Sequence, residues 1–284
     1  MWSAEQPFFI PLEAYFDKAY HAITGTSYTS FKFEEGVTPL STVPEVAAAC
    51  VIYLVTIFGG QYLMRNRKAF KLDFLFKVHN LFLTVVSATL LLLIAENIIP
   101  IVWNQGLFGS VCYQTSWTQR LEFLYYLNYL TKYYELIDTI FLVLKKKKLE
   151  FLHYYHHSLT MVLCFTQLIG STAVSWVPIT LNLCVHVLMY YYYYRATAGV
   201  RIWWKKYLTT MQITQFILDL GFVYFCTYTF FAFNFFPFLP HVADCSGTVG
   251  AALFGCALLS SYLVLFINFF RKTYKKPASK PKQN

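Results

Sequence analysis

The residues best suited to chemistry lie in one short stretch, 151–157, which holds three of the chain's seven histidines. On a helix, His153 and His157 would share a face four residues apart, with His156 one turn from His153. Imidazole exchanges protons near neutral pH and can also act as a nucleophile. A single histidine is more often structural, but three together predict a site that transfers protons or acyl groups.

Polar side chains recur at helical spacing in the apolar segment that precedes these histidines. One stripe, with Asp138 beside it, carries Asn128, Lys132, Glu135 and Thr139. Charges inside a bilayer are costly and usually face a partner or a cavity. An ion pair between Lys132 and Glu135 that only holds helices together is one interpretation. A site is the other, because three charges and an amide exceed what one pair requires.

Two later segments carry similar stripes, which consist of Asn182, His186, Tyr190 and Tyr193, and of Gln212, Gln215 and Asp219. A glutamine pair can simply bond neighbouring helices, for well under about 2 kcal/mol each. A smaller polar group, Lys77, His79 and Asn80, either reaches toward the membrane interface or lines a site. Both interpretations of each group stay open at this point.

The elements that must position these residues are membrane helices. Of the 284 residues 57% are hydrophobic and 13% charged, against roughly 25% charged in a soluble domain. A bilayer span needs about 20 apolar residues, and long apolar runs without strand-like alternation predict an all-α membrane protein. We expect seven transmembrane helices, at about 46–64, 73–98, 121–144, 151–169, 174–194, 207–231 and 249–270.

The cations predict how these helices are oriented. Eighteen of the 23 Lys and Arg residues fall on one side of the expected bundle. By the positive-inside rule that side is cytosolic, which puts the N-terminus in the lumen and the C-terminus in the cytosol. We expect a luminal segment over 1–43, the seven-helix domain over 44–271 and a basic cytosolic tail over 272–284. Lys280 and Lys282 resemble a retrieval signal for the endoplasmic reticulum.

Two of the seven cysteines, Cys112 and Cys245, fall in segments that this topology assigns to the lumen. The lumen is oxidising enough to keep a disulfide. We therefore predict that these two residues are bonded.

The depths of the polar residues in the membrane predict that they line a single buried chamber. At about 1.5 Å per residue, His156 lies about 9 Å and His186 about 13 Å inside the cytosolic boundary, near the level of Asp138 and Gln212. Lys132 and Asp219 lie deeper, near 20 Å by the same rise. Imidazoles above an apolar tunnel, beneath a cationic rim that suits phosphates, predict acyl transfer on a phosphate-bearing carrier such as coenzyme A.

Four motifs in this order and spacing resemble those of the fatty acid elongases, the 3-oxoacyl-CoA synthases of the endoplasmic reticulum. They are Lys132-Tyr-Tyr-Glu135-Leu-Ile-Asp138-Thr139, His153-Tyr-Tyr-His156-His157, His186-Val-Leu-Met189-Tyr190-Tyr-Tyr-Tyr193 and Gln212-Ile-Thr-Gln215. The resemblance spans about 72–270 and is nearest to fungal members that lengthen saturated and monounsaturated chains.

The resemblance implies that malonyl-CoA loses carbon dioxide and condenses with an acyl-CoA to give a 3-oxoacyl-CoA two carbons longer. It implies a seven-helix fold in which six helices enclose a narrow tunnel closed at the luminal end. The condensation uses no cofactor or metal beyond its two substrates. The reductase and dehydratase steps that complete elongation belong to other enzymes, which are expected partners.

Residue roles follow by similarity. His156 and His186 are the expected catalytic imidazoles, with His156 as the nucleophile, while His153 and His157 orient and polarise the site. Asp138, Asn182 and Gln212 position imidazoles or bind the developing enolate oxygen. The residues expected to bind substrate are Lys132, Glu135, Gln215, Tyr190 and Tyr193. Those expected to bind the coenzyme A phosphates are Lys145, Lys146, Lys147, Lys148, Arg201, Lys205 and Lys206.

Chain length should depend on the depth of the tunnel. Bulky residues at the luminal end of the helix at 207–231 are the expected stop for medium to long acyl chains. They are Tyr224, Phe225, Tyr228, Phe230 and Phe231.

Two rival functions are weighed against this one. A membrane di-iron desaturase has a similar H-x-x-H-H box, but it needs about eight histidines, and at most five of the seven here lie on the cytosolic side. A seven-helix receptor or transporter shares the topology. Its polar residues would be expected in an extracellular pocket or at midplane helix breaks, not at the cytosolic helix ends.

Overall fold

The computed structural model describes residues 7–8 and 10–274, and within these it contains helices and no strand. Lys280 and Lys282, the expected retrieval signal, lie outside the described residues. The α-helices are α1 (Leu12–Thr24), α2 (Val43–Met64), α3 (Asp73–Cys112), α4 (Gln119–Glu135), α5 (Ile137–Leu144), α6 (Phe151–Ile169), α7 (Trp176–Thr197), α8 (Lys205–Phe235) and α9 (Val249–Tyr274).

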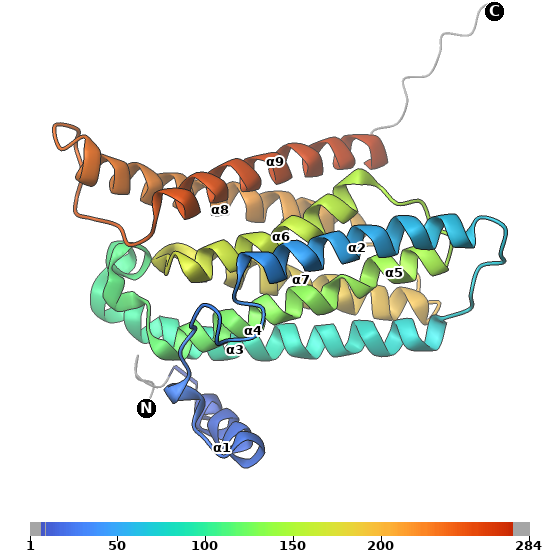
Figure 1. Ribbon diagram of the computed structural model, residues 1–284, viewed down its shortest axis with the longest axis horizontal. Helices are drawn as coiled ribbons and strands as arrows, with labels where there is room; N and C mark the ends of the chain where they lie inside the picture. Colours follow the sequence, from blue (N-terminus) through green and yellow to red (C-terminus); the bar gives the residue numbers. More distant parts are fainter. Residues whose placement is uncertain (1–6, 9, 275–284) are drawn as a thin grey trace, which may run out of the picture.

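The long helices run side by side and alternate in direction, so their connections gather at the two ends of one elongated bundle (Figure 1). The connections at one end, residues 65–72, 145–150 and 198–204, carry nine of the 23 Lys and Arg residues, and the helix ends beside them carry Arg195, Lys205, Lys206, Arg271 and Lys272. The uneven charge of the sequence is therefore a property of one end of the molecule. We refer to this end as the basic end.

Five helical segments are long and apolar enough to cross a membrane: α2, α3, residues 173–197 (α7 with the preceding turn), α8 and α9. The chain is thus an all-α, multi-pass membrane protein. The other two predicted spans do not meet these limits. α4 and α5 together cover 121–144 but are separated at Leu136, and α6 begins with the polar histidine stretch.

Two predicted boundaries need correction. α3 does not end near residue 98 but continues to Cys112, although Pro100 removes a backbone donor and Gly106 has a positive φ of 68°, which kinks the helix there. The span at 121–144 is interrupted at Leu136, where backbone bonds shorten to an i to i+3 pattern from Leu136 to Tyr133 and from Thr139 to Leu136. This tighter turn lies between Glu135 and Asp138.

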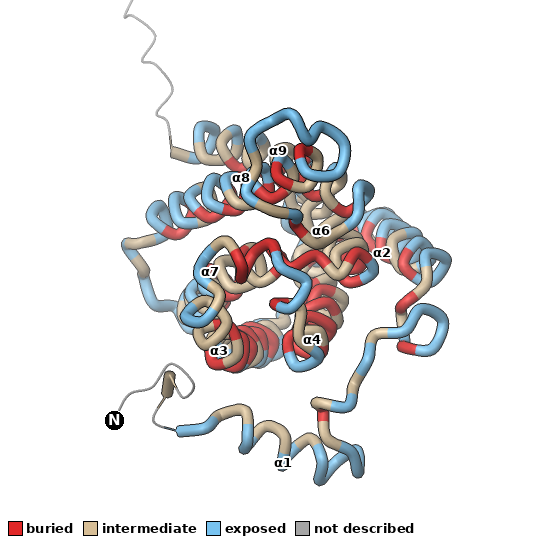
Figure 2. Tube along the Cα trace, turned by 90° about the vertical axis from the view of Figure 1, so that its left-hand side faces the viewer, coloured by how far each residue is buried: buried red, intermediate tan, exposed pale blue. Residues whose placement is uncertain are grey.

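The buried parts of the helices lie toward the inside of the bundle and the exposed parts toward the outside (Figure 2). Many of the exposed residues are large and apolar. α2 lies at the periphery, and only four of its residues are buried. α1 lies outside the bundle beside α3 (Figure 1), and its Tyr20 packs edge-on to Phe123 of α4 at 5.1 Å between ring centroids. The outer apolar faces are those expected of helices in contact with lipid.

Cys112, the last residue of α3, is joined to Cys245 by a disulfide. Cys245 lies in the connection between α8 and α9, and the neighbouring Ser246 amide donates to the Cys112 carbonyl at 2.7 Å. The predicted pairing is therefore the one that the structure contains. It fastens the α8–α9 connection over the end of the bundle opposite the basic end.

Candidate active site

Two cavities meet inside the bundle. The first, the histidine cavity, opens toward the basic end and is lined by His153, His156, His157, His186, Asp138 and Gln212, among others. The second, the apolar cavity, extends toward the opposite end between α4, α6, α7, α8 and α9. Four residues line both cavities: His156, Asn182, Gln215 and Phe216. A ligand that occupied both would pass these four side chains.

His156 is the histidine at this junction. Its ring packs against Tyr262 of α9 at 4.8 Å and Phe266 at 5.7 Å, and the Tyr262 hydroxyl donates to its backbone carbonyl at 3.2 Å. Within residues 10–274, no hydrogen bond engages the His156 ring nitrogens. An imidazole held by aromatic packing, with its nitrogens free, is available to attack a substrate carbonyl.

His186 is held differently, at the end of a chain of four polar side chains. Lys132 Nζ donates to Glu135 Oε1 and to Asn182 Oδ1, both at 2.9 Å. The Asn182 amide nitrogen lies 3.2 Å from His186 Nε2, and His186 Nδ1 lies 3.2 Å from Glu135 Oε1. The last separation is within ion-pair range, although the ring N–H is not aligned for a hydrogen bond.

We call Lys132, Glu135, Asn182 and His186 the Lys132 network. It connects the predicted ion pair to residues of the candidate site. Lys132, Glu135 and His186 are 2%, 3% and 5% exposed, so their charges are well removed from water. The pair between Lys132 and Glu135 exists, but it also reaches two residues of α7 that line the histidine cavity. Both ring nitrogens of His186 already face partners, so this imidazole is positioned and not free.

Asp138 is the centre of a second network. His79 Nε2 contacts Asp138 Oδ1 at 2.7 Å, and the Tyr190 hydroxyl donates to Asp138 Oδ2 at 2.9 Å. His79 stacks on Tyr134 at 5.0 Å, and Tyr53 of α2 bonds to the neighbouring Thr139 at 2.7 Å. Asp138 is thus fixed from α3 and α7.

His79 is the residue that sequence reasoning left undecided between an interfacial position and a site. It is 3% exposed and does not reach the interface, because it turns inward to Asp138. Its spacing within the polar group of residues 77–80 was the available signal. Nothing in the sequence could show that this face of α3 is turned toward α5.

The remaining predicted site residues are placed as follows. The rings of His153 and His157 lie 4.4 Å apart, and His153 Nε2 is buried with no hydrogen-bond partner among the described residues. The amide nitrogen of Gln212 donates to Met189 Sδ at 3.5 Å. Gln215 donates to Asp219 Oδ2 at 3.2 Å. Gln212 and Gln215 both line the histidine cavity.

Two of the rim lysines hold connections together. Lys145 Nζ pairs with Asp73 Oδ1 at 2.7 Å, and Lys146 Nζ donates to the carbonyls of Arg65 and Arg67, each at 3.0 Å. These bonds tie the α5–α6 connection to the α2–α3 connection. Lys145 and Lys146 would have to give up contacts in order to bind a phosphate.

Other rim cations are better placed for a ligand. Lys205 lines the histidine cavity, and Lys147 and Arg201 have no polar partner within the described part of the chain. Lys148 also lines this cavity, but it would have to give up its pairing with Glu150 in order to bind a phosphate. Lys206 lies over the Phe270 ring at 5.9 Å. Lys148 donates a hydrogen bond to exposed Glu150 at 2.8 Å, which lowers the pKa of Glu150 below its ordinary value. This pair therefore persists at neutral pH and is lost only as the pH falls through that lowered pKa.

The expected chain-length residues need correction. Tyr224 and Tyr228 are 51% and 47% exposed, and neither they nor Phe231 line the apolar cavity. Beyond Asp219, the α8 residues that do so are Val223, Cys226, Thr227 and Phe230. These positions recur at three, one and three residues, which is one helical face. Of the bulky residues considered, only Phe230 is turned inward.

We therefore predict that Phe230→Ala lengthens the products by at least one two-carbon step, because it removes the largest α8 side chain at the part of the cavity far from the histidines. Tyr228→Ala is the matched control on the outer face, where the tyrosine hydroxyl bonds to the Pro240 carbonyl. Product chain lengths are read by mass spectrometry with a ladder of acyl-CoA substrates. A shift with Tyr228→Ala and none with Phe230→Ala would contradict this assignment.

The histidines do not form a metal-ligand group. Among the residues described, three potential ligand atoms lie within 4.8 Å of one another only at Cys112, Cys226 and Cys245, and two of these are in the disulfide. A di-iron centre requires clustered imidazole and carboxylate ligands. The side-chain arrangement therefore does not favour the desaturase alternative.

The fold and the site define an α-helical membrane protein in which a free, half-buried imidazole lies between a polar cavity under a basic end and a long apolar cavity. This is the arrangement of an enzyme that handles acyl chains carried by a charged group. A family model described as the GNS1/SUR4 family (ELO) matches residues 38–282. The chain belongs to this family.

Similar proteins support the same assignment. Putative fatty acid elongase 1 of Schizosaccharomyces pombe is 50% identical over 281 residues, which cover 99% of this chain and 84% of that protein. Putative fatty acid elongase 2 of the same organism is 45% identical over 95% of this chain and 74% of its own length. Fatty acid elongase A of Dictyostelium discoideum is 38% identical over 88% of this chain and 90% of its own. The family assignment made from the four motifs is confirmed.

Proposed function

We propose that the protein catalyses the condensing step of fatty acid elongation, in which an acyl-CoA and malonyl-CoA give a 3-oxoacyl-CoA, carbon dioxide and free coenzyme A. The observation that carries this proposal is the free imidazole of His156 at the junction of the two cavities. An acyl chain in the apolar cavity would bring its thioester carbonyl to this ring.

In the first half-reaction, a His156 nitrogen attacks the thioester carbonyl. The carbon–sulfur bond breaks, coenzyme A leaves as the thiolate and takes up a proton, and the acyl group stays on the imidazole. Gln215 and Asn182 line both cavities at this level and are placed to donate hydrogen bonds to the carbonyl oxygen as it gains charge.

In the second half-reaction, malonyl-CoA occupies the histidine cavity. Its carboxylate carbon–carbon bond breaks, carbon dioxide leaves, and the electron pair forms the new bond to the acyl carbon. The carbon–nitrogen bond to His156 then breaks, and the imidazole is regenerated. The Lys132 network holds His186 beside this reaction, where hydrogen bonds to the enolate oxygen contribute most if they are preorganised.

The two cavities act in this proposal as one acyl tunnel inside seven membrane passes, with α4 and α5 together forming one pass and α6 another. The polar residues that make these helices less apolar face the interior or the histidine cavity, where they do not meet lipid. The basic end faces the cytosol, in the endoplasmic reticulum membrane, and the Cys112–Cys245 disulfide lies in the lumen.

At the basic end, Lys147, Lys148, Arg201 and Lys205 are the proposed contacts for coenzyme A phosphates, because they are exposed or line the histidine cavity. Condensation needs no cofactor or metal. The reduction and dehydration of the product belong to other proteins, which would act on it at the same membrane.

The test is to incubate the purified protein in detergent or vesicles with malonyl-CoA and a ladder of acyl-CoA lengths. We expect carbon dioxide release that depends on the acyl-CoA, together with a 3-oxoacyl-CoA two carbons longer than the substrate. Failure to release carbon dioxide with any acyl-CoA would overturn the proposal and favour a receptor or transporter.

A further inference from the structure

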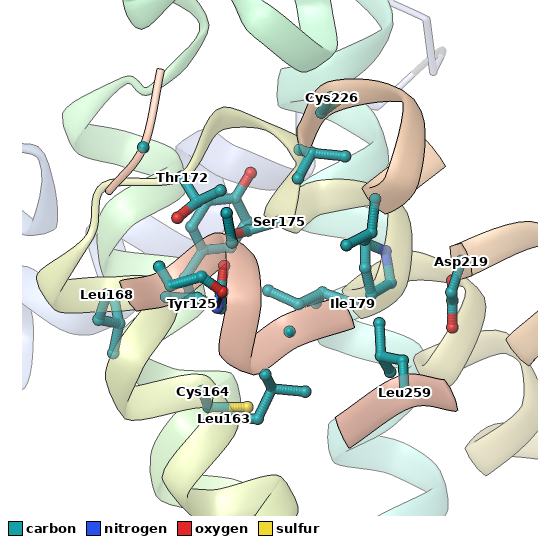
Figure 3. A pocket seen from close by; sticks show the side chains of 18 of the residues that line it. Tyr125, Leu163, Cys164, Leu168, Thr172, Ser175, Ile179, Asp219, Cys226 and Leu259 are labelled. Carbon is teal, nitrogen blue, oxygen red and sulfur yellow. Dashed lines mark hydrogen bonds between the residues drawn. The ribbon is translucent and has the colours of Figure 1, made fainter. Parts of the chain in front are cut away.

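The end of the apolar cavity far from the histidines is polar. Five hydroxyl-bearing residues line it, from three segments of the chain: Tyr125, Thr172, Ser175, Ser246 and Thr248. In Figure 3, Tyr125, Thr172 and Ser175 lie together at one side of the cavity and Asp219 lies at the other. A cavity built only for the methyl end of an acyl chain would not need hydroxyl groups at this depth.

Two of these hydroxyls have no partner. Thr172 Oγ1 and Ser175 Oγ are buried and make no hydrogen bond to any other described residue, and the two residues are 8% and 6% exposed. Neighbouring hydroxyls are engaged, since Ser246 Oγ accepts from the Ala173 amide and Thr248 Oγ1 accepts from the Ala251 amide, both at 3.3 Å. Tyr125 is a third hydroxyl that makes no hydrogen bond within the described part of the chain, but only Thr172 Oγ1 and Ser175 Oγ combine this with complete burial of the oxygen.

The absence of hydrogen-bond partners for Thr172 and Ser175 is informative because of where these two residues lie in the chain. Thr172 precedes a 3₁₀ turn (Ala173–Ser175) and Ser175 precedes α7, and both are of the residue types that cap helix amino termini. Neither side chain accepts a capping bond. A buried hydroxyl without a partner costs roughly 1–3 kcal/mol, so two at one cavity end point to a ligand that bonds to them.

The charged side chains near the polar end of the apolar cavity limit which ligands it can bind. The charged side chains that line the apolar cavity are Lys132 and Asp219. Lys132 belongs to the network at the histidines, and Asp219 lies at the side of the cavity opposite Thr172 (Figure 3). A carboxylate at the polar end would have no cation beside it, which is unfavourable in a membrane interior. A neutral group that both donates and accepts hydrogen bonds fits better.

The depth of this end fits the far terminus of a long chain. Residues 156–169 of α6 run along the cavity from His156 toward Thr172. At 1.5 Å per residue this is about 20 Å, so the group that meets Thr172 and Ser175 is the end of the acyl chain and not a substituent near the thioester.

We propose that this polar end is a subsite for a terminal hydroxyl, and that the protein accepts long-chain acyl-CoA substrates hydroxylated at the ω carbon. This proposal rests on the condensation proposed above, and it names a class of substrate for the same tunnel. Thr172 and Ser175 each exchange a hydrogen bond with the ω-hydroxyl. A methyl terminus of the same reach leaves both hydroxyls unpaired, so the subsite also disfavours methyl-ended chains that extend this far.

The experiment compares two matched acyl-CoA ladders, one methyl-ended and one ω-hydroxylated, with the wild-type protein and the double variant Thr172→Val, Ser175→Ala. In the wild type we expect ω-hydroxylated chains that reach the subsite to be condensed with higher kcat/KM than methyl-ended chains of equal length. In the double variant we expect this ratio to fall roughly tenfold, as the loss of two hydrogen bonds predicts. Thr166→Val is the control, because Thr166 bonds to the Leu163 carbonyl and lies outside the cavity.

A chain that ends in a methyl ether tests the same point without a variant. It keeps the oxygen but cannot donate a hydrogen bond, so its kcat/KM should lie below that of the ω-hydroxylated chain. Equal ratios for the wild type and the double variant, or no preference between ladders at any length, would overturn the subsite and leave water as its occupant. Absence of condensation with both ladders would instead overturn the proposed function.

Discussion

Replacing His156 with alanine is expected to abolish condensation, with kcat falling at least about a thousandfold, as for other nucleophiles removed from covalent mechanisms. The physical reason is its position. His156 is the histidine that lines both cavities, and no hydrogen bond within residues 10–274 occupies its ring nitrogens. His186 cannot replace it, because its two nitrogens face Glu135 and Asn182. Product formation is measured by mass spectrometry.

A second measurement separates a nucleophile from a general base. When purified protein is incubated with acyl-CoA alone, an acyl adduct on the intact chain is expected for the wild type and for His186→Ala, but not for His156→Ala. His241→Ala, in the α8–α9 connection and outside both cavities, is the control for the loss of any histidine. An adduct retained in His156→Ala would exclude His156 as the nucleophile.

The position of residues on one helix could be predicted from the sequence because side chains three or four places apart share a face. His153 and His157 are indeed neighbours, Lys132 pairs with Glu135, and Gln215 bonds to Asp219. The prediction that polar residues of different helices meet at one depth was also sound, since helix rise is nearly constant. Most residues predicted to be catalytic line the histidine cavity.

Contacts between helices could not be predicted, because they depend on how far each helix is rotated about its axis. His79 meets Asp138 only because α3 turns that face toward α5. On α8 a rotation of one residue, about 100°, separates outward Tyr228 from inward Thr227. The size of a side chain does not show whether it faces the cavity or the outside of the bundle. The interruption at Leu136 also left no clear signal, because no Gly or Pro lies between residues 121 and 144.

Hydrogen bonds that are missing carry as much information as those that are present. Eight buried side-chain atoms have no hydrogen-bond partner in the described chain, and six of them belong to residues that line one of the two cavities: Asn128, His153, Thr172, Ser175, His186 and Asp219. Buried polar atoms are usually satisfied. Their concentration along the proposed tunnel is therefore what a site that awaits a polar ligand or water would show, and sequence patterns contain no record of it.

Breaking the Lys132 network is expected to have the largest combined effect on stability and activity. Lys132→Met should lower the free energy of unfolding by about 3–5 kcal/mol, because it leaves Glu135 as an unpaired buried charge. Removing both charges, in Lys132→Met with Glu135→Met, should be less destabilising than either single change, because no uncompensated charge remains. Denaturant unfolding in detergent micelles measures all three.

Measuring the activity of the double variant tests whether the Lys132 network has only a structural role. The double variant regains stability but not catalysis, because Asn182 loses its bond to Lys132 and His186 loses Glu135. A misplaced imidazole costs about a hundredfold in kcat. Lys32→Met is the matched control, since Lys32 pairs with Glu34 at 3.1 Å on the surface, where an ion pair contributes little. If the double variant were as destabilised as the sum of its single variants, or regained full activity, Lys132 and Glu135 would not form the coupled unit that positions His186.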